Sequence, residues 1–175
     1  FCAKCYKHCT NFFLLVNEVH RYETKPNKFY EEYPCWNESM MLKDFGTMFK
    51  GMDIVLLNLQ YGEVQGEIDE FTKDTGIEVL QCKSVDNRED LDGLAALIEL
   101  CDLIVSTSNI TIHLAGALGK ETWVLVSSEG GIWWLLDRTD SIWYPTLRLY
   151  RQKTLDDWGS VLSIIHQDLQ KKFGE

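Results

Sequence analysis

The sequence has little positive charge and no long apolar run. Its 175 residues carry 17 Lys and Arg against 27 Asp and Glu, a net charge of −10 at pH 7. A field of that sign repels nucleic acid and anionic membranes, so an anionic ligand must be held by local groups. No apolar stretch approaches the roughly 20 residues that span a bilayer, and no secretory signal is recognisable. We expect a soluble, cytoplasmic protein without a membrane span and without a nucleic-acid partner.

Proline and glycine are also scarce, and the cysteines form no clear framework. Only 3 Pro and 12 Gly interrupt a chain that is 45% hydrophobic, which disfavours disorder and collagen-like structure. Of six cysteines, Cys82 and Cys101 lie in apolar segments that we expect in the core, which favours reduced thiols. The segment from Cys2 to Cys9 groups four metal-ligand residues, but no second pair follows, as a structural zinc site requires. We expect a frayed terminus there and no metal site.

Short apolar runs alternate with amphipathic stretches along the rest of the chain. This alternation is typical of a parallel sheet whose strands are joined by crossover helices. The runs are almost continuously apolar, as in strands covered on both faces. The expected strands are Asn11–Val19, Asp53–Asn58, Glu78–Cys82, Asp102–Ser106, Thr122–Ser127 and Leu147–Tyr150. The expected helices are one from Asn37 that stops before Gly51, Glu63–Asp74, Arg88–Leu100, Asn109–Leu118 and Thr154–Phe173.

The pattern predicts an α/β fold with a Rossmann-like, doubly wound parallel sheet in one domain. Residues 1–36 are expected to be an irregular N-terminal segment with the first strand, and residues 37–175 the main lobe. In the strand order 3-2-1-4-5, the first and fourth strands are neighbours where the order reverses, and ligands bind outside their carboxyl ends. Two long irregular segments, 17–36 and 128–146, should face that crevice, and long loops in compact domains are often functional.

The turn before the helix at Asn109–Leu118 is the strongest candidate for a binding site. Unpaired amides in the first turn of a helix, with the helix dipole behind them, hold a phosphate without net positive charge. A histidine one turn further lies on the same face and could donate to a phosphate or sugar oxygen. Alternatively, the polar residues simply cap the helix and the histidine is structural. The candidate residues are Ser108, Asn109, Ile110, Thr111, Ile112 and His113.

The tryptophan-rich segment 128–146 admits two interpretations. The aromatic residues of the segment, beside Arg138, could stack on a nucleobase or sugar ring and clamp a phosphate; they are Trp133, Trp134, Trp143 and Tyr144. Alternatively, the aromatic residues form a lid at the end of the sheet and bury apolar area.

Several motifs, in order, resemble a known family. They are Leu57-Asn-Leu-Gln-Tyr-Gly62, Asp92-Gly-Leu-Ala-Ala-Leu-Ile98, Cys101-Asp-Leu-Ile-Val-Ser-Thr-Ser-Asn-Ile-Thr-Ile-His-Leu-Ala-Gly-Ala-Leu-Gly119, Thr122-Trp-Val-Leu125, Trp134-Leu-Leu-Asp-Arg138, Asp140-Ser-Ile-Trp-Tyr-Pro145 and Leu149-Tyr-Arg-Gln152. Over roughly residues 37–173 the chain resembles the glycosyltransferase-like domain found behind tetratricopeptide repeats in many bacterial proteins. That domain is similar to the donor lobe of glycosyltransferase family 9, the heptosyltransferase family.

The resemblance implies one GT-B-type lobe that binds a nucleotide diphosphate sugar as substrate, without a metal or other cofactor. By position, Ser108, Asn109, Thr111 and His113 would receive the diphosphate, while Gln60 and Gly62 would border the donor cleft. Catalysis would need a second, N-terminal lobe or a tetratricopeptide-repeat region, so no catalytic residue is assigned and this chain alone is expected to be inactive. The alternative is a degenerate, non-catalytic Rossmann-like domain for binding or protein interaction.

Overall fold

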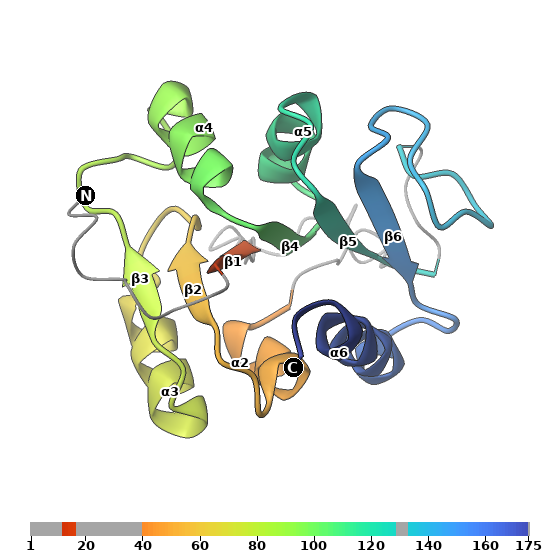
Figure 1. Cartoon of the computed structure of the whole chain (residues 1–175), viewed down its shortest axis with the longest axis horizontal. Helices are drawn as coiled ribbons and strands as arrows, with labels where there is room; N and C mark the ends of the chain where they lie inside the picture. Colours follow the sequence, from red (N-terminus) through yellow and green to blue (C-terminus); the bar gives the residue numbers. More distant parts are fainter. Residues whose placement is uncertain (1–11, 17–39, 129–132, 175) are drawn as a thin grey trace, which may run out of the picture.

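Six parallel strands form one sheet in the order β3-β2-β1-β4-β5-β6 (Figure 1). The structure, a computed structural model, describes residues 12–16, 40–128 and 133–174, and for 12–16 the backbone alone. The strands are β1 (Phe12–Val16), β2 (Val55–Asn58), β3 (Val79–Gln81), β4 (Leu103–Thr107), β5 (Thr122–Val126) and β6 (Leu147–Arg151). The helices are α2 (Leu42–Phe45), the 3-10 helix η2 (Gly46–Phe49), α3 (Gln65–Thr75), α4 (Leu91–Leu100), α5 (Ile110–Ala117) and α6 (Trp158–Phe173).

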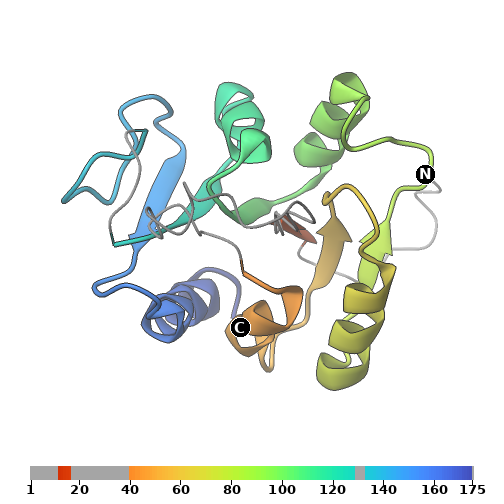
Figure 2. The same ribbon diagram turned by 180° about the vertical axis from the view of Figure 1, so that it is seen from behind.

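Helices cover both faces of the sheet. In Figures 1 and 2, α4 and α5 lie on one face, and α2, α3 and α6 lie on the other. Phe45, Phe71 and Ile165 belong to the core on the second face, while Leu97 and Ala115 belong to the core on the first. Every residue of β2, β4 and β5 is buried, as expected of strands covered on both sides. The predicted doubly wound α/β sheet is confirmed.

The strand positions agree with prediction to within a few residues, whereas the helices begin one to five residues later than expected. The helix expected from Asn37 is described only from residue 40 on, where it is the short α2 followed by η2. Helix α4 begins at Leu91 rather than Arg88, because the Asp90 carboxylate caps it and accepts from the amide of Gly93 at 2.8 Å. In the same way Asp157 caps α6, which therefore starts at Trp158 rather than at Thr154.

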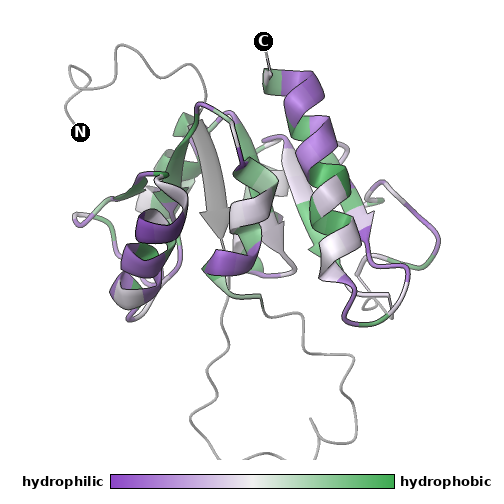
Figure 3. Cartoon of the chain, turned by 90° about the horizontal axis from the view of Figure 1, so that it is seen from below, coloured by the Kyte–Doolittle hydropathy of each residue, from purple (hydrophilic) through white to green (hydrophobic). Residues whose placement is uncertain are grey.

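Helix α6 is joined to β6 by one shared carboxylate. The guanidinium of Arg148 lies 2.8 Å from Asp168, the Tyr150 hydroxyl donates to the same carboxylate at 3.1 Å, and Lys171 lies at 3.2 Å. Desolvation acts to raise the pKa of Asp168, but the hydrogen bonds from Lys171 and Tyr150 and the charge of Arg148 outweigh it and lower that pKa. Along α6, hydrophobic and hydrophilic residues alternate, as in a helix with one buried face (Figure 3). Within the described ranges, no helix is both long and apolar enough to cross a membrane.

Two adjacent isoleucines of α6 test this packing. Ile165 is fully buried, whereas Ile164 is 42% exposed. We expect Ile165→Ala to lower the free energy of unfolding by about 2–5 kcal/mol, because it leaves a cavity against the sheet. The matched control Ile164→Ala should change it by less than about 0.5 kcal/mol. Urea unfolding measures both, and equal losses in the two variants would contradict the assigned face of α6.

Candidate functional site

The candidate site lies at the carboxyl-terminal edge of the sheet, where the strand order reverses. Strand β1 lies between β2 and β4, and its last residue, Val16, pairs with Ser106 of β4. The chain then enters α5 directly from β4. The predicted crevice loop 17–36 lies outside the described residues, as does the group of metal-ligand residues from Cys2 to Cys9.

The start of α5 is held by a cap that sequence reasoning identified. The side-chain oxygen of Asn109 accepts from the amide of Ile112 at 3.3 Å, and its Nδ2 donates to Ser106 Oγ at 2.7 Å. The prediction that the Ile112 amide binds a ligand is therefore wrong, because the cap already uses it. Among the described residues, the amides of Ile110 and Thr111 have no acceptor, as expected in the first turn of a helix. Thr111 as a whole residue is only 5% exposed, whereas Ile110 is 65% exposed, so Ile110 is the more accessible of the two.

Trp134 is buried beside this turn rather than offered to a ligand. Its side chain is 2% exposed, and its indole Nε1 donates to Ser108 Oγ at 2.9 Å. Its ring also stacks on the His113 ring, with centroids 5.3 Å apart and an interplanar angle of 16°. The prediction that Trp134 stacks on a nucleobase or sugar is therefore wrong. Trp134 is instead part of a lid that buries apolar area at the end of the sheet. Its hydrogen bond holds the Ser108 hydroxyl next to the N-terminus of α5.

His113 is enclosed by aromatic rings on three sides. Besides stacking on Trp134, it meets the edges of Trp133 at 5.9 Å and Tyr144 at 5.8 Å between centroids. Its Nδ1 lies 3.3 Å from the Tyr144 hydroxyl, which leaves Nε2 as the ring nitrogen available to a ligand. Burial lowers the pKa of His113 below its ordinary value of 6.5, so the imidazole is neutral at pH 7. A neutral imidazole can donate one hydrogen bond to a phosphate but adds no charge.

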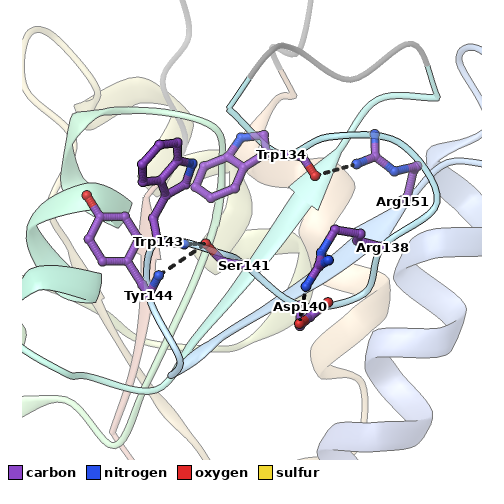
Figure 4. Close-up of polar contacts among 7 residues, drawn as sticks. All are labelled: Trp134, Arg138, Asp140, Ser141, Trp143, Tyr144 and Arg151. Atoms are coloured by element: carbon purple, nitrogen blue, oxygen red, sulfur yellow. Dashed lines mark hydrogen bonds and ion pairs between the residues drawn. The ribbon is translucent and has the colours of Figure 1, made fainter.

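The loop that carries these rings is pinned to the sheet by Arg151 at the end of β6. Its guanidinium donates to the carbonyl oxygen of Trp134 at 3.3 Å (Figure 4). It also donates to the carbonyl oxygens of Ser127 at 3.0 Å and of Leu135. Arg138, the predicted phosphate clamp, instead pairs with Asp140 at 2.6 Å, apart from Trp143 and Tyr144 in the same view. The structure therefore does not bring Arg138 to the start of α5. Sequence reasoning missed Arg151, whose role depends on contacts across the loop.

A pocket of about 220 Å³ opens at the same edge of the sheet, beyond the ends of β2 and β3, and both Gln60 and Gly62 line it as predicted. Gln60 is 8% exposed, yet among the described residues neither its Nε2 nor its Oε1 has a hydrogen-bond partner. Its main chain is fixed by Asn58 Oδ1, which accepts from its amide at 3.1 Å, and by Asn87 Nδ2, which donates to its carbonyl oxygen at 3.0 Å. An unpaired buried carboxamide lowers the stability of the folded state by about 1–3 kcal/mol. Lys83 also lines the pocket and supplies a cation that the sequence reading missed.

The edge therefore presents neutral hydrogen-bonding groups together with one lysine, Lys83, and one carboxylate, Asp86. Across the described ranges, no three His, Cys, Asp or Glu side chains gather as metal ligands. Cys82 and Cys101 are free thiols, and burial raises the pKa of Cys101 to about 12, so that thiol is inert at neutral pH. Amides, a neutral imidazole and a carboxamide can hold an uncharged ring or an anion by hydrogen bonds alone.

Comparison with known proteins gives one relative. Over 105 residues, 60% of this chain, the sequence is 35% identical to Protein FlbA of Caulobacter vibrioides (strain ATCC 19089 / CIP 103742 / CB 15). The match covers 17% of that protein, so the chain spans less than a fifth of the length of the curated relative it matches. No protein-family model and no solved structure matches the chain.

Gly116 allows Tyr144 to pack against α5, and its substitution tests the enclosure of His113. A Cβ at Gly116 would lie 2.5 Å from Tyr144 Cγ. We expect Gly116→Ala to displace that ring and lower the free energy of unfolding by about 1–3 kcal/mol in urea titrations. In α3, nothing lies within 4 Å of a Cβ at Gly66, so the control Gly66→Ala should raise stability by up to about 1 kcal/mol. A stabilised Gly116→Ala variant would contradict the close packing.

The lowered pKa of His113 predicts a pH dependence of stability. The folded state favours the neutral His113 ring, so protonation of this ring favours unfolding. The free energy of unfolding is therefore unaffected by this ring above pH 6.5 and decreases as the pH falls from 6.5 to the lower pKa of the folded state. We expect the stability difference between the wild type and His113→Gln to shrink between pH 7 and pH 5. Urea unfolding at each pH measures it, and a difference that grows on acidification would contradict the burial of His113.

Proposed function

We propose that this chain is the nucleotide-sugar-binding lobe of a metal-independent glycosyltransferase. The observation that carries the proposal is the unpartnered, buried carboxamide of Gln60 in a pocket at the same sheet edge as the free amides of α5. A carboxamide both donates and accepts, as the edge of a nucleobase or a ribose requires. The strand order supports this position, because ligands of doubly wound sheets bind where the order reverses.

The diphosphate would lie at the start of α5. The amides of Ile110 and Thr111 lie in the first turn, where no intrahelical acceptor is present, and the helix dipole adds to their attraction for an anion. Ser108 Oγ accepts from Trp134, so its own hydrogen remains available to an oxygen of the ligand, and Nε2 of His113 lies one turn away. Donors fixed before the reaction stabilise the charge that develops on a leaving diphosphate. This arrangement compensates for the net charge of −10.

Glycosyl transfer by such a lobe would need groups from outside this chain. The described residues place no carboxylate against Ser108, His113 or the first turn of α5 as a base for an acceptor. Because the match to Protein FlbA covers 17% of that protein, a longer relative has room for a second lobe. We infer that the acceptor and the catalytic base belong to such a lobe or to a tetratricopeptide-repeat region.

A second candidate function is a non-catalytic domain that binds other proteins. The observation that favours it is the cover over α5, where Trp134 is buried and three aromatic rings enclose His113. If the helix end only anchors the loop, His113→Ala would alter thermal stability without affecting the binding of any nucleotide. If it is a donor site, His113→Ala would weaken nucleotide binding as well.

Gln60→Met tests the proposed function because it keeps the length of the side chain and removes both polar atoms. We expect calorimetric titration with ADP-, UDP- and GDP-sugars to show binding of at least one of them to the wild type. Gln60→Met should weaken that binding about tenfold or more and raise the free energy of unfolding by about 1 kcal/mol, because an unpaired buried group is removed.

The control for this experiment is Gln170→Met on α6, where the glutamine is exposed. That variant should bind like the wild type. Absence of heat with every donor at millimolar concentration would contradict the proposed function. Unchanged binding by Gln60→Met would contradict the role of the pocket.

A further inference from the structure

Two tryptophans stand in solvent beside the enclosed histidine. Trp133 is 54% exposed and Trp143 is 55% exposed, and their ring centroids lie 6.5 Å apart at an interplanar angle of 64°. Trp133 also meets the ring of His113 at 5.9 Å. We call Trp133 and Trp143 the tryptophan pair. Its two rings meet at a steep angle and leave about half of each side chain uncovered.

The tryptophan pair is held in place although it is exposed. Trp143 Nε1 donates to the carbonyl oxygen of Trp133 at 3.0 Å, and Ser141 Oγ accepts from the amides of Trp143 at 3.2 Å and Tyr144 at 3.3 Å (Figure 4). A loop that served only to bury apolar area would turn these rings inward, as it does with Trp134. Large apolar side chains kept in solvent on a fixed backbone indicate a pre-organised binding surface.

The backbone of the same loop carries conformational strain. Leu135 has φ 50° and Asp137 has φ 57°, both in the left-handed region that residues with a Cβ rarely adopt. Arg151 compensates at Leu135 by donating to its carbonyl oxygen. Strain that the surroundings hold in place is concentrated at ligand-binding segments, which fits a loop shaped to present its rings.

We propose that the tryptophan pair binds a pyranose ring. A pyranose has an apolar C–H face that packs on an aromatic ring and a rim of hydroxyls that exchange hydrogen bonds. The hydroxyl of Ser141 accepts from the amide of Trp143 and keeps its own hydrogen for that rim. Within residues 133–146, Arg138 and Asp140 form one ion pair and Asp137 adds a negative charge, so the segment favours a neutral ligand over an anion.

The position of the pair favours a sugar over a polypeptide. Trp133 contacts His113, which lies within one turn of the amides of Ile110 and Thr111. If those amides hold a diphosphate, the group attached to it reaches the tryptophan pair, and in a nucleotide sugar that group is a sugar ring. This step rests on the proposed function. The same ring chemistry could also come from a saccharide that acts as acceptor.

The indole N–H signals of Trp133 and Trp143 in the NMR spectrum of the 175-residue chain report on the tryptophan pair directly. The probes are UDP and UDP-glucose, ADP and ADP-glucose, GDP and GDP-mannose, and the free saccharides maltotriose and chitotriose. We expect a sugar-bearing probe to shift both signals, while its matched nucleoside diphosphate leaves them in place. Trp133→Ala and Trp143→Ala should each weaken binding of that sugar-bearing probe about five- to a hundredfold.

The control variant is Leu136→Ala, which removes a 61% exposed side chain from the same loop and should bind like the wild type. A response to nucleotide sugars assigns the donor as the source of the ring, and a response to free saccharides assigns the acceptor. If nucleoside diphosphates bind but no probe shifts the indole signals, the tryptophan pair is not a sugar site and the proposed function survives.

If no nucleotide binds but a free saccharide shifts both signals, the sugar site stands and the proposed function fails. The inference is overturned if no probe shifts the signals. It is also overturned if they move with protein concentration alone and the alanine variants abolish that movement, because the surface would then be a contact between copies of the chain.

Discussion

The hydrogen bond from the indole of Trp134 to the hydroxyl of Ser108 connects the loop after β5 to the turn before α5. Because of this contact the Trp134 ring lies flat on His113, the hydroxyl of Ser108 is fixed at the mouth of the helix, and the loop beyond is held at its base. Gly116 completes the arrangement by leaving room for Tyr144 on the other side of the histidine. Both the proposed diphosphate site and the tryptophan pair depend on this one junction between loop and helix.

The proposed site would allow an acidic protein to attract an anion without a cluster of cations. Main-chain amides and the helix dipole contribute partial positive charge that does not depend on the net charge of −10. The Gln60 pocket lowers the stability of the protein, because a buried carboxamide without a partner among the described residues destabilises the folded state. Its main chain is nevertheless anchored by Asn58 and Asn87, so the side chain is kept in place for a ligand. Stability given up at such a position is typical of a binding site.

The architecture was predictable because it follows from local signals, whereas the site was predictable only in part. The apolar runs predicted the strands. Asn109 marked the start of α5 as its N-cap, and Gly76, which is left-handed in the structure, marked the end of α3. The orientation of Trp134 was not predictable, because spacing does not tell whether an indole faces a ligand or bonds to a serine 26 residues away. The pairing of Arg138 with Asp140 instead of a phosphate likewise depends on the folded path of the loop. Gln60 was placed correctly, but its lack of a partner is visible only once the surrounding atoms are in position.

The central claim is that the first-turn amides of α5 bind a diphosphate. The most direct measurement is the backbone amide spectrum of the 15N-labelled chain during titration with ADP, UDP and GDP, each free of metal. The account predicts that one of these ligands shifts the amide protons of Ile110 and Thr111 downfield, while the amide of Ile112, already bonded to Asn109, moves least of the three. If Ile110 and Thr111 remain unmoved at millimolar concentrations of all three, the helix end is only an anchor for the loop and the account is contradicted.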